Sequence, residues 1–180
     1  ALPIWWHVDA WQCKIKTRKI YVFAAVETLT KFVVMAVYAS KAAKNAVHFI
    51  SNWIIYQFGV PHIITSDRGG EFHDKIGDAL MAQLGIRRIR TSHYSPRSNG
   101  EIEIRFRFLK RFLQKNSRDY EDLKVWVPRA AFALNLSPNA TTLHSPFYLM
   151  YGFQPASVAA YQTFAPKPLD PIACKSTTRE

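Results

Sequence analysis

Three consecutive strand-like segments at the start of the chain constrain the fold most strongly. Residues 5–13 (WWHVDAWQC) and residues 20–39 (IYVFAAVETLTKFVVMAVYA) are rich in aromatic and β-branched side chains. A charged turn, KIKTRK, separates the two segments, and ETLTK divides the second into two halves joined by a tight turn. Segments of this composition, bounded by short polar turns, are typical of antiparallel strands. The sequence therefore predicts a three-stranded meander.

The rest of the chain alternates helical and strand-like patterns. A helix is expected from Ser40, as its cap, to Phe58, because Ala43, Val47, Ile50, Ile54 and Phe58 recur at helical spacing before Gly59 and Pro61. Short strands are predicted over 62–66 and 86–91, and further helices over 71–84, 101–116, 120–135 (interrupted or kinked near Pro128) and 145–152. A meander followed by βαβ-like units predicts an α/β fold, a mixed sheet with helices on its faces.

Composition limits the classes of function. The 180 residues are 48% hydrophobic, which suffices for one domain with a core, and the net charge of +11 indicates a polyanionic partner, although many basic domains are merely soluble. Cys13 and Cys174 form no CxxC pair, so neither a zinc knuckle nor a disulfide framework is supported, and an intracellular setting is expected. No apolar run reaches the roughly 20 residues that span a bilayer, so no membrane partner is expected.

Three acidic residues stand where chemistry would require them. Asp9 lies within the first predicted strand, Asp67 follows the fourth, and Glu103 lies in the first turn of a helix, with 57 and 35 residues in the two gaps. An ionised Asp in an apolar strand is costly unless it is paired or binds a metal. Adjacent carboxylates suit Mg²⁺, and two such ions support in-line phosphoryl displacement. Taken singly, a strand-edge ion pair for Asp9 and turn chemistry for Asp67 are the better explanations of these residues.

The surroundings of these acids carry a resemblance. The segment TSDRGGEF is similar to the second-aspartate motif of retroviral and long-terminal-repeat retrotransposon integrases, and HYSPRSNGEIE to their H-x-P-Q-S-N-G-x-x-E segment. The segment WVPRAAFALNLSPNATTLHSPFYLMYGFQP resembles the end of the catalytic core in Ty3/gypsy-type elements. Together with the 35-residue gap, these motifs identify the chain as resembling an integrase catalytic core of the D,D-35-E type over about residues 4–155.

The resemblance implies a ribonuclease H-like fold, with a mixed five-stranded sheet and helices on both faces. Residues 1–155 would form the core and residues 156–180 a Pro-rich linker or tail. Asp9, Asp67 and Glu103 would be catalytic and would hold two Mg²⁺ or Mn²⁺ ions. Two DNA reactions follow from it: trimming of element 3′ ends, then attack of the freed 3′-hydroxyl on target DNA. A homo-oligomer acting in the nucleus or in intracellular virus-like particles is also implied.

Candidate DNA contacts surround Glu103. Ten of the 24 basic residues lie between Arg87 and Arg118, and Arg107 and Lys110 share a helix face with Glu103, which fits a DNA backbone lying over the metals or a merely solvated basic face. By resemblance, the preceding loop touches DNA, although a turn with a helix cap explains the same residues; its candidates are Tyr94, Arg97, Ser98 and Asn99.

The segment departs from the family pattern at three places: Glu101 stands where Gln is usual, Ile104 where Arg is usual, and Phe106 where Asn is common. Because residues i and i+2 point apart on a helix, catalysis is assigned to Glu103, and Glu101 is a first-turn acid favoured by the helix dipole. Two other classes of function stay open: an integrase-derived DNA-binding protein without catalysis, and a ribonuclease H-like nuclease that only hydrolyses.

Overall fold

The computed structural model describes residues 4–15, 18–66, 75–90, 106–107, 109–113 and 117–156. Its strands are β1 (Trp5–Ile15), β2 (Arg18–Glu27), β3 (Val33–Tyr38), β4 (Ile63–Ser66) and β5 (Arg87–Arg90). Its helices are α1 (Ala43–Ile50), η1 (Ser51–Ile55), α2 (Tyr56–Phe58), α3 (Lys75–Gln83), α5 (Tyr120–Leu136) and α6 (Pro146–Tyr151). Residues 106–107 and 109–113 are also helical, and we call them the 106–113 helix.

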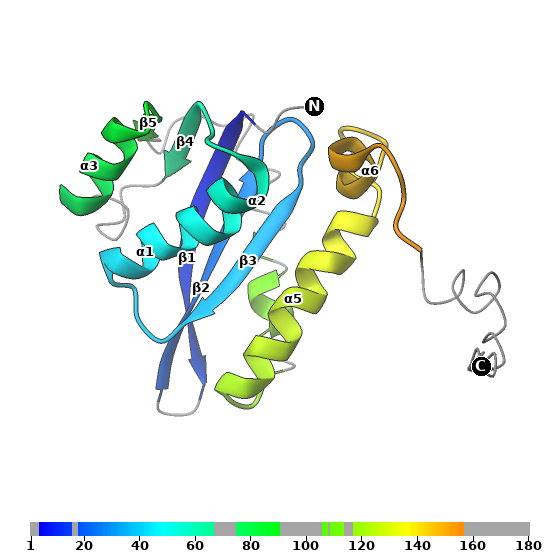
Figure 1. The fold of residues 1–180 in the computed structure, drawn as a ribbon. Coiled ribbons are helices and arrows are strands. Elements are labelled where there is room, and N and C mark those ends of the chain that lie inside the picture. Colours follow the sequence, from blue (N-terminus) through cyan, green and yellow to red (C-terminus); the bar gives the residue numbers. More distant parts are fainter. Residues whose placement is uncertain are drawn as a thin grey trace, which may run out of the picture.

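The strands form one mixed sheet in the order β3-β2-β1-β4-β5 (Figure 1). β1, β2 and β3 are antiparallel neighbours, whereas β4 runs parallel to β1, and β5 runs parallel to β4. The predicted meander and mixed sheet are therefore confirmed. The predicted charged turn is shorter than expected, because β1 continues to Ile15 and β2 begins at Arg18.

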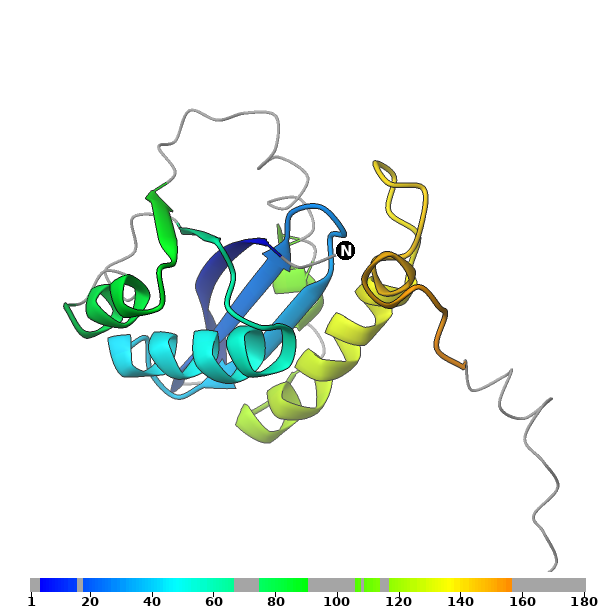
Figure 2. The same cartoon turned by 45° about the horizontal axis from the view of Figure 1, so that its top comes forward.

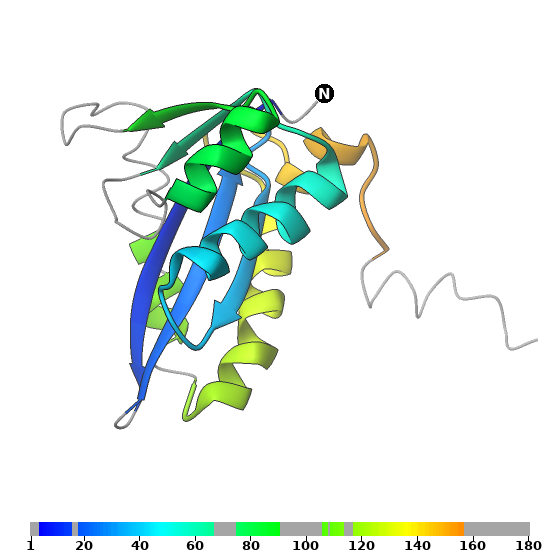
Figure 3. The ribbon, with the colours of Figure 1, turned by 60° about the vertical axis from the view of Figure 1, so that its left-hand side comes forward.

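Each face of the sheet is covered by its own helices, as Figures 2 and 3 show. On one face, Trp6, Val8 and Ala10 of β1 join a buried apolar cluster with side chains of α1, η1 and α3. On the other, Trp11 and Cys13 join a second cluster with the 106–113 helix and α5. This split follows from the strand period of two, which sends successive side chains of β1 to opposite faces.

The long helix after β3 differs from its prediction at its start and in its middle. Ser40 is not its cap: α1 begins at Ala43, after an extended Ala42 that provides no side-chain hydrogen bond. The Ser40 hydroxyl instead accepts a hydrogen bond of 3.0 Å from Asn45 Nδ2. Between α1 and α2, η1 is a π-helical turn of five residues, a feature that the apolar spacing did not predict. The helix ends as expected, at a positive-φ Gly59.

The later helices agree with the sequence more closely. α5 begins at Tyr120 and is capped by Asp119, whose carboxylate accepts a hydrogen bond from Asp122 N. It continues through Pro128, so the predicted interruption there does not occur. Pro128 is exposed on this helix. α6 begins with a Ser145 cap and a proline in its first turn, then ends at the left-handed Gly152. None of the helices in the described ranges is long and apolar enough to cross a membrane.

Candidate active site

Asp9 lies in the middle of β1, on the face of the sheet that the 106–113 helix and α5 cover. It is opposite Ala24 of β2, whose side chain belongs to that same buried cluster. Asp9 is half-buried, and its Oδ1 accepts a hydrogen bond of 2.7 Å from the backbone N–H of Ala10. This bond fixes the orientation of the carboxylate on a rigid strand.

β4 ends beside the residue that precedes Asp9. Val8 pairs with Ser66, and Asp67 directly follows Ser66 in the sequence. Side chains at Ile63 and Thr65 are in register with Trp5 and His7, so alternate residues of β4 share the face of Asp9. Asp67 itself lies outside the described residues.

The 106–113 helix packs beside Asp9 in a defined direction. The ring of Phe106 lies 5.3 Å from that of Trp11, two residues beyond Asp9 on the same face. One turn later, Lys110 Nζ lies 5.3 Å from the Trp11 ring centroid, and its charge also acts on Cys13. The helix thus runs along β1 in the same sense as the strand, so its N-terminal end lies toward Asp9. Glu103 precedes Phe106 by three residues but lies outside the described part of the chain.

A buried thiol lies beneath this helix. Burial raises the pKa of the Cys13 thiol, and the nearby Lys110 ammonium opposes that rise. A thiol kept protonated in this way is a poor metal ligand or nucleophile, because both roles require the thiolate. Cys13 is therefore a core residue of this face.

The donor chemistry at Asp9 fits a hard divalent cation. Carboxylate oxygens are the ligands that Mg²⁺ and Mn²⁺ prefer, and Asp9 is partly open to solvent. Within the described ranges, no three His, Cys, Asp or Glu residues are grouped so that they could hold an ion. The other two predicted ligands, Asp67 and Glu103, lie outside those ranges.

Comparison with known proteins decides the family. Residues 3–96 match the family described as "Integrase core domain". The chain belongs to this family. It is 25% identical over 166 residues to the Gag-Pol polyprotein of gibbon ape leukemia virus, and this match covers 91% of the chain and 10% of the polyprotein. It is 28% identical over 137 residues to the Gypsy retrotransposon integrase-like protein 1 of Bos taurus, covering 76% of the chain and 27% of that protein.

A solved integrase core confirms the fold. The catalytic core domain of BIV integrase superposes with a TM-score of 0.65 at 25% sequence identity, covering 81% of this chain and 91% of that one. The predicted ribonuclease H-like fold and the resemblance to integrase cores are thus confirmed. The chain spans only about a tenth of the length of the viral polyprotein that it matches.

The predicted DNA contacts of this integrase core are only partly described. Arg107 is exposed and Lys110 is half-buried against Trp11, so the two share a helix but differ in environment. The loop candidates Tyr94, Arg97, Ser98 and Asn99 lie outside the described residues, as do Glu101 and Ile104. Phe106 is 4% exposed, so the side chain that stands where Asn is common serves packing in this chain.

Our sequence analysis missed the neighbours of Asp9 on its own face. Trp5, Trp11 and Cys13 are four residues before, two after and four after Asp9, so strand alternation could have identified them. The indole Nε1 of Trp5 donates a hydrogen bond of 2.6 Å to Thr65 Oγ1 on β4. These residues define what surrounds the carboxylate.

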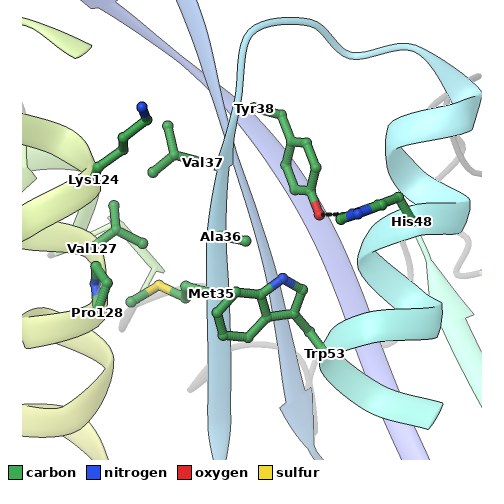
Figure 4. Close-up of a pocket in the computed structure, with 9 residues that line it drawn as sticks. All are labelled: Met35, Ala36, Val37, Tyr38, His48, Trp53, Lys124, Val127 and Pro128. Atoms are coloured by element: carbon green, nitrogen blue, oxygen red, sulfur yellow. Dashed lines mark hydrogen bonds between the residues drawn. The ribbon is translucent and has the colours of Figure 1, made fainter. Parts of the chain in front are cut away.

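A separate pocket of about 280 Å³ lies at the β3 edge of the sheet, between α1–η1 and α5 (Figure 4). Its walls include Met35, Trp53 and Val127, and Tyr38 Oη lies 2.9 Å from His48 Nδ1 at its rim. Burial raises the pKa of Tyr38 to about 12. No carboxylate lines this pocket, so it offers none of the ligands that a hard cation requires.

Proposed function

We propose that this chain catalyses divalent-metal-dependent phosphoryl transfer on DNA. Two reactions would share one site: hydrolytic trimming of element 3′ ends, and attack of the freed 3′-hydroxyl on a phosphodiester of target DNA. Both form and break a P–O bond, so both require the same arrangement of ligands. Residues 1–155 constitute the catalytic core in this proposal, and residues 156–180 a linker or tail.

The observation that carries the proposal is the packing of the 106–113 helix on Trp11. Phe106 and Lys110 contact the same indole ring, which locates the helix beside Trp11, and the effect of Lys110 on Cys13 indicates its direction along β1. The approach of this helix to Asp9 with its N-terminal end supports our proposal that Glu103 acts together with Asp9. The pairing of Val8 with Ser66 supports the same position for Asp67, one residue further along each strand.

Asp9, Asp67 and Glu103 would hold two Mg²⁺ or Mn²⁺ ions. Such ions activate the attacking oxygen and stabilise the leaving oxygen in an in-line displacement. The role of Asp9 is to present an oriented carboxylate, since the Ala10 N–H holds its Oδ1 at 2.7 Å. Membership of the integrase core family supports the assignment, because the resemblance of the three motifs implies this role for their carboxylates.

DNA is the substrate in this proposal. Arg107 is exposed one turn beyond Glu103, where a guanidinium can hold a phosphate without reading sequence. Tyr94, Arg97, Ser98 and Asn99 are proposed to contact DNA on the loop before Glu103, with Lys110 adding charge beside Trp11. The net charge of +11 supports a polyanionic partner.

The decisive experiment uses a branched DNA that mimics the joined product, with Mn²⁺ or Mg²⁺. We expect the protein to reverse the joining reaction, and Asp9→Asn, Asp67→Asn and Glu103→Gln each to abolish that activity. Glu121→Gln is the matched control, because Glu121 is an exposed acid on α5 that pairs with Lys124 at 3.0 Å. The control should keep full activity.

The same assay separates the other two classes of function. A protein that binds the branched DNA but never cuts or rejoins it with either metal would be a non-catalytic DNA-binding derivative. The buried Phe106 is the reason to test for this outcome, since its phenyl ring stands where integrases commonly have Asn. A protein that hydrolyses DNA but never joins it would be a simple nuclease.

We also propose self-association in the nucleus or in virus-like particles. β3 is an edge strand, and the pocket beside it is lined mainly by apolar side chains, with Tyr38, His48 and Lys124 among them. On α5, Val125 and Phe132 are 47% and 51% exposed, which fits a covered surface. We expect light scattering to show an oligomer that Val125→Glu weakens; a monomeric parent protein would contradict this.

A further inference from the structure

Trp5 is an exposed aromatic residue on the face of the sheet that carries Asp9. The side chains of Trp5, Asp9, Trp11 and Cys13 alternate along β1 toward this face. Trp11 and Cys13 are buried beneath the 106–113 helix, whereas Trp5 is 41% exposed. The indole of Trp5 thus lies on the side of Asp9 that is opposite to this helix.

Trp5 is held in place by a hydrogen bond of its side chain and by the pairing of its backbone. Its indole Nε1–H donates to Thr65 Oγ1 at 2.6 Å, and Thr65 is itself only 4% exposed. The backbone carbonyl of Trp5 accepts a hydrogen bond of 2.9 Å from Thr28 N, and its strand pairs with Ile63 of β4. An aromatic ring that is already oriented before binding loses little conformational entropy when a ligand stacks on it.

A cation lies in the same row of the sheet. Trp5 pairs with Ile63, and Ile63 pairs with Arg87 of β5, so the three side chains point to one face across three neighbouring strands. At about 4.8 Å per strand, the backbone of Arg87 is about 10 Å from that of Trp5. Arg87 is exposed, whereas the next residue, Arg88, points to the other face and pairs with Asp78 of α3.

The row lies within reach of the reacting phosphate. Asp9 is four positions beyond Trp5 on an extended strand, which is about 13 Å at 3.3 Å per residue. One DNA strand advances by about 3.4 Å per nucleotide along a B-form helix, so this distance corresponds to about four stacked nucleotides, or fewer if the strand is unstacked.

We propose that Trp5 stacks against one unpaired base of the DNA held at Asp9, with Arg87 contacting a neighbouring phosphate. An aromatic face beside a cation is the arrangement that binds single-stranded nucleic acid, because every base offers a π-face. The stacked base is within about four nucleotides of the reacting phosphate. This positioning role of Trp5 rests on the proposed function of the chain as a DNA-joining enzyme.

The test places single abasic sites along the branched DNA. The branch fixes the register, and abasic sites are moved outward over six nucleotides. Binding is measured by fluorescence anisotropy without divalent metal, and reversal of joining is measured with Mn²⁺. In the unaltered protein, we expect one or two positions within about four nucleotides of the branch to weaken binding by about fivefold to a hundredfold.

Three substitutions then test whether Trp5 causes the sensitivity to the abasic position. Trp5→Leu keeps apolar bulk without a π-face, and it should weaken binding of intact DNA by the same factor while losing the sensitivity to the abasic position. Trp5→Phe keeps the π-face without the donor to Thr65, and it should retain the sensitive position. Tyr56→Ala removes an aromatic side chain that is 77% exposed on α2, and it should leave the profile unchanged.

The outcomes separate the two proposals. A Trp5→Leu protein that is folded by circular dichroism and keeps the parental abasic profile overturns the role of Trp5, even if joining is reversed normally. Absence of any sensitive position in the unaltered protein overturns it as well. A protein that neither binds nor cleaves the branched DNA overturns the proposed function, and the role of Trp5 with it.

Discussion

Val8 and Asp9 are adjacent in β1, yet they lie in opposite environments. Val8 is fully buried in the cluster that α1, η1 and α3 cover, and this face carries apolar side chains along the whole middle of β1. Asp9 is half-buried on the other face, between the exposed Trp5 and the buried Trp11.

The difference between the two faces separates stability from chemistry. The Val8 face is closed by a continuous helix from Ala43 to Phe58 and by α3, so nothing polar is needed there. On the Asp9 face, the described part of the 106–113 helix shares a buried cluster with Trp11 and Cys13 of β1. A single strand therefore anchors the core on one side and presents a carboxylate on the other.

The strongest way to test this difference is to move the charge to the closed face. Val8→Asp places a carboxylate in a fully buried apolar cluster, at a cost of several kcal/mol, comparable to the whole stability of a domain. We expect loss of the cooperative urea transition and of near-ultraviolet circular dichroism. A native-like spectrum from this variant would show that the Val8 face tolerates charge and would remove the distinction.

Neutralising the charge on the open face should affect activity rather than stability. Asp9→Asn keeps the shape of the side chain, so we expect reversal of joining to fall by at least about a thousandfold, as for essential catalytic groups. The midpoint of urea unfolding should change little. A variant that keeps substantial activity would remove Asp9 from the site.

Equal cavities on the two faces should differ in their effect on activity. Phe106→Ala and Phe49→Ala each remove a buried ring, and each should lower the free energy of unfolding by about 3–5 kcal/mol. Only Phe106→Ala should reduce activity further, by about a hundredfold at a temperature where both variants are folded, because it loosens the helix that leads to Glu103. Equal losses of activity would indicate that the packing on Trp11 has no special role.

The smallest expected effect concerns a polar contact at the rim of the Val8 face. Burial raises the pKa of Tyr38 to about 12 from its ordinary value of 10, so folding favours the neutral phenol. The contribution to stability is complete below pH 10 and is lost as the pH rises from 10 to about 12. Tyr38→Phe should remove this slope and one late step in the phenolate absorbance titration. An unchanged titration would place that step on another tyrosine.

The sequence by itself determined the elements and the candidate chemistry. Segments rich in aromatic and β-branched residues predicted β1, β2 and β3. This was possible because the strand period is local, so that successive side chains point to opposite faces. Gly59 and Gly152 marked helix ends, since a positive φ favours glycine. The spacing of Asp9, Asp67 and Glu103 indicated the family to which the chain belongs.

Only the tertiary structure decided what each face of the sheet is for. The start of α1 at Ala43 rather than at Ser40, and the π-helical turn of η1, became known only from the structure. The placement of the 106–113 helix became known from the contacts of Phe106 and Lys110 with Trp11. About a hundred residues of sequence separate the helix from Trp11. The exposure of Trp5 on the face of Asp9 likewise became known only from the structure, because burial is set by long-range contacts that a local pattern does not encode.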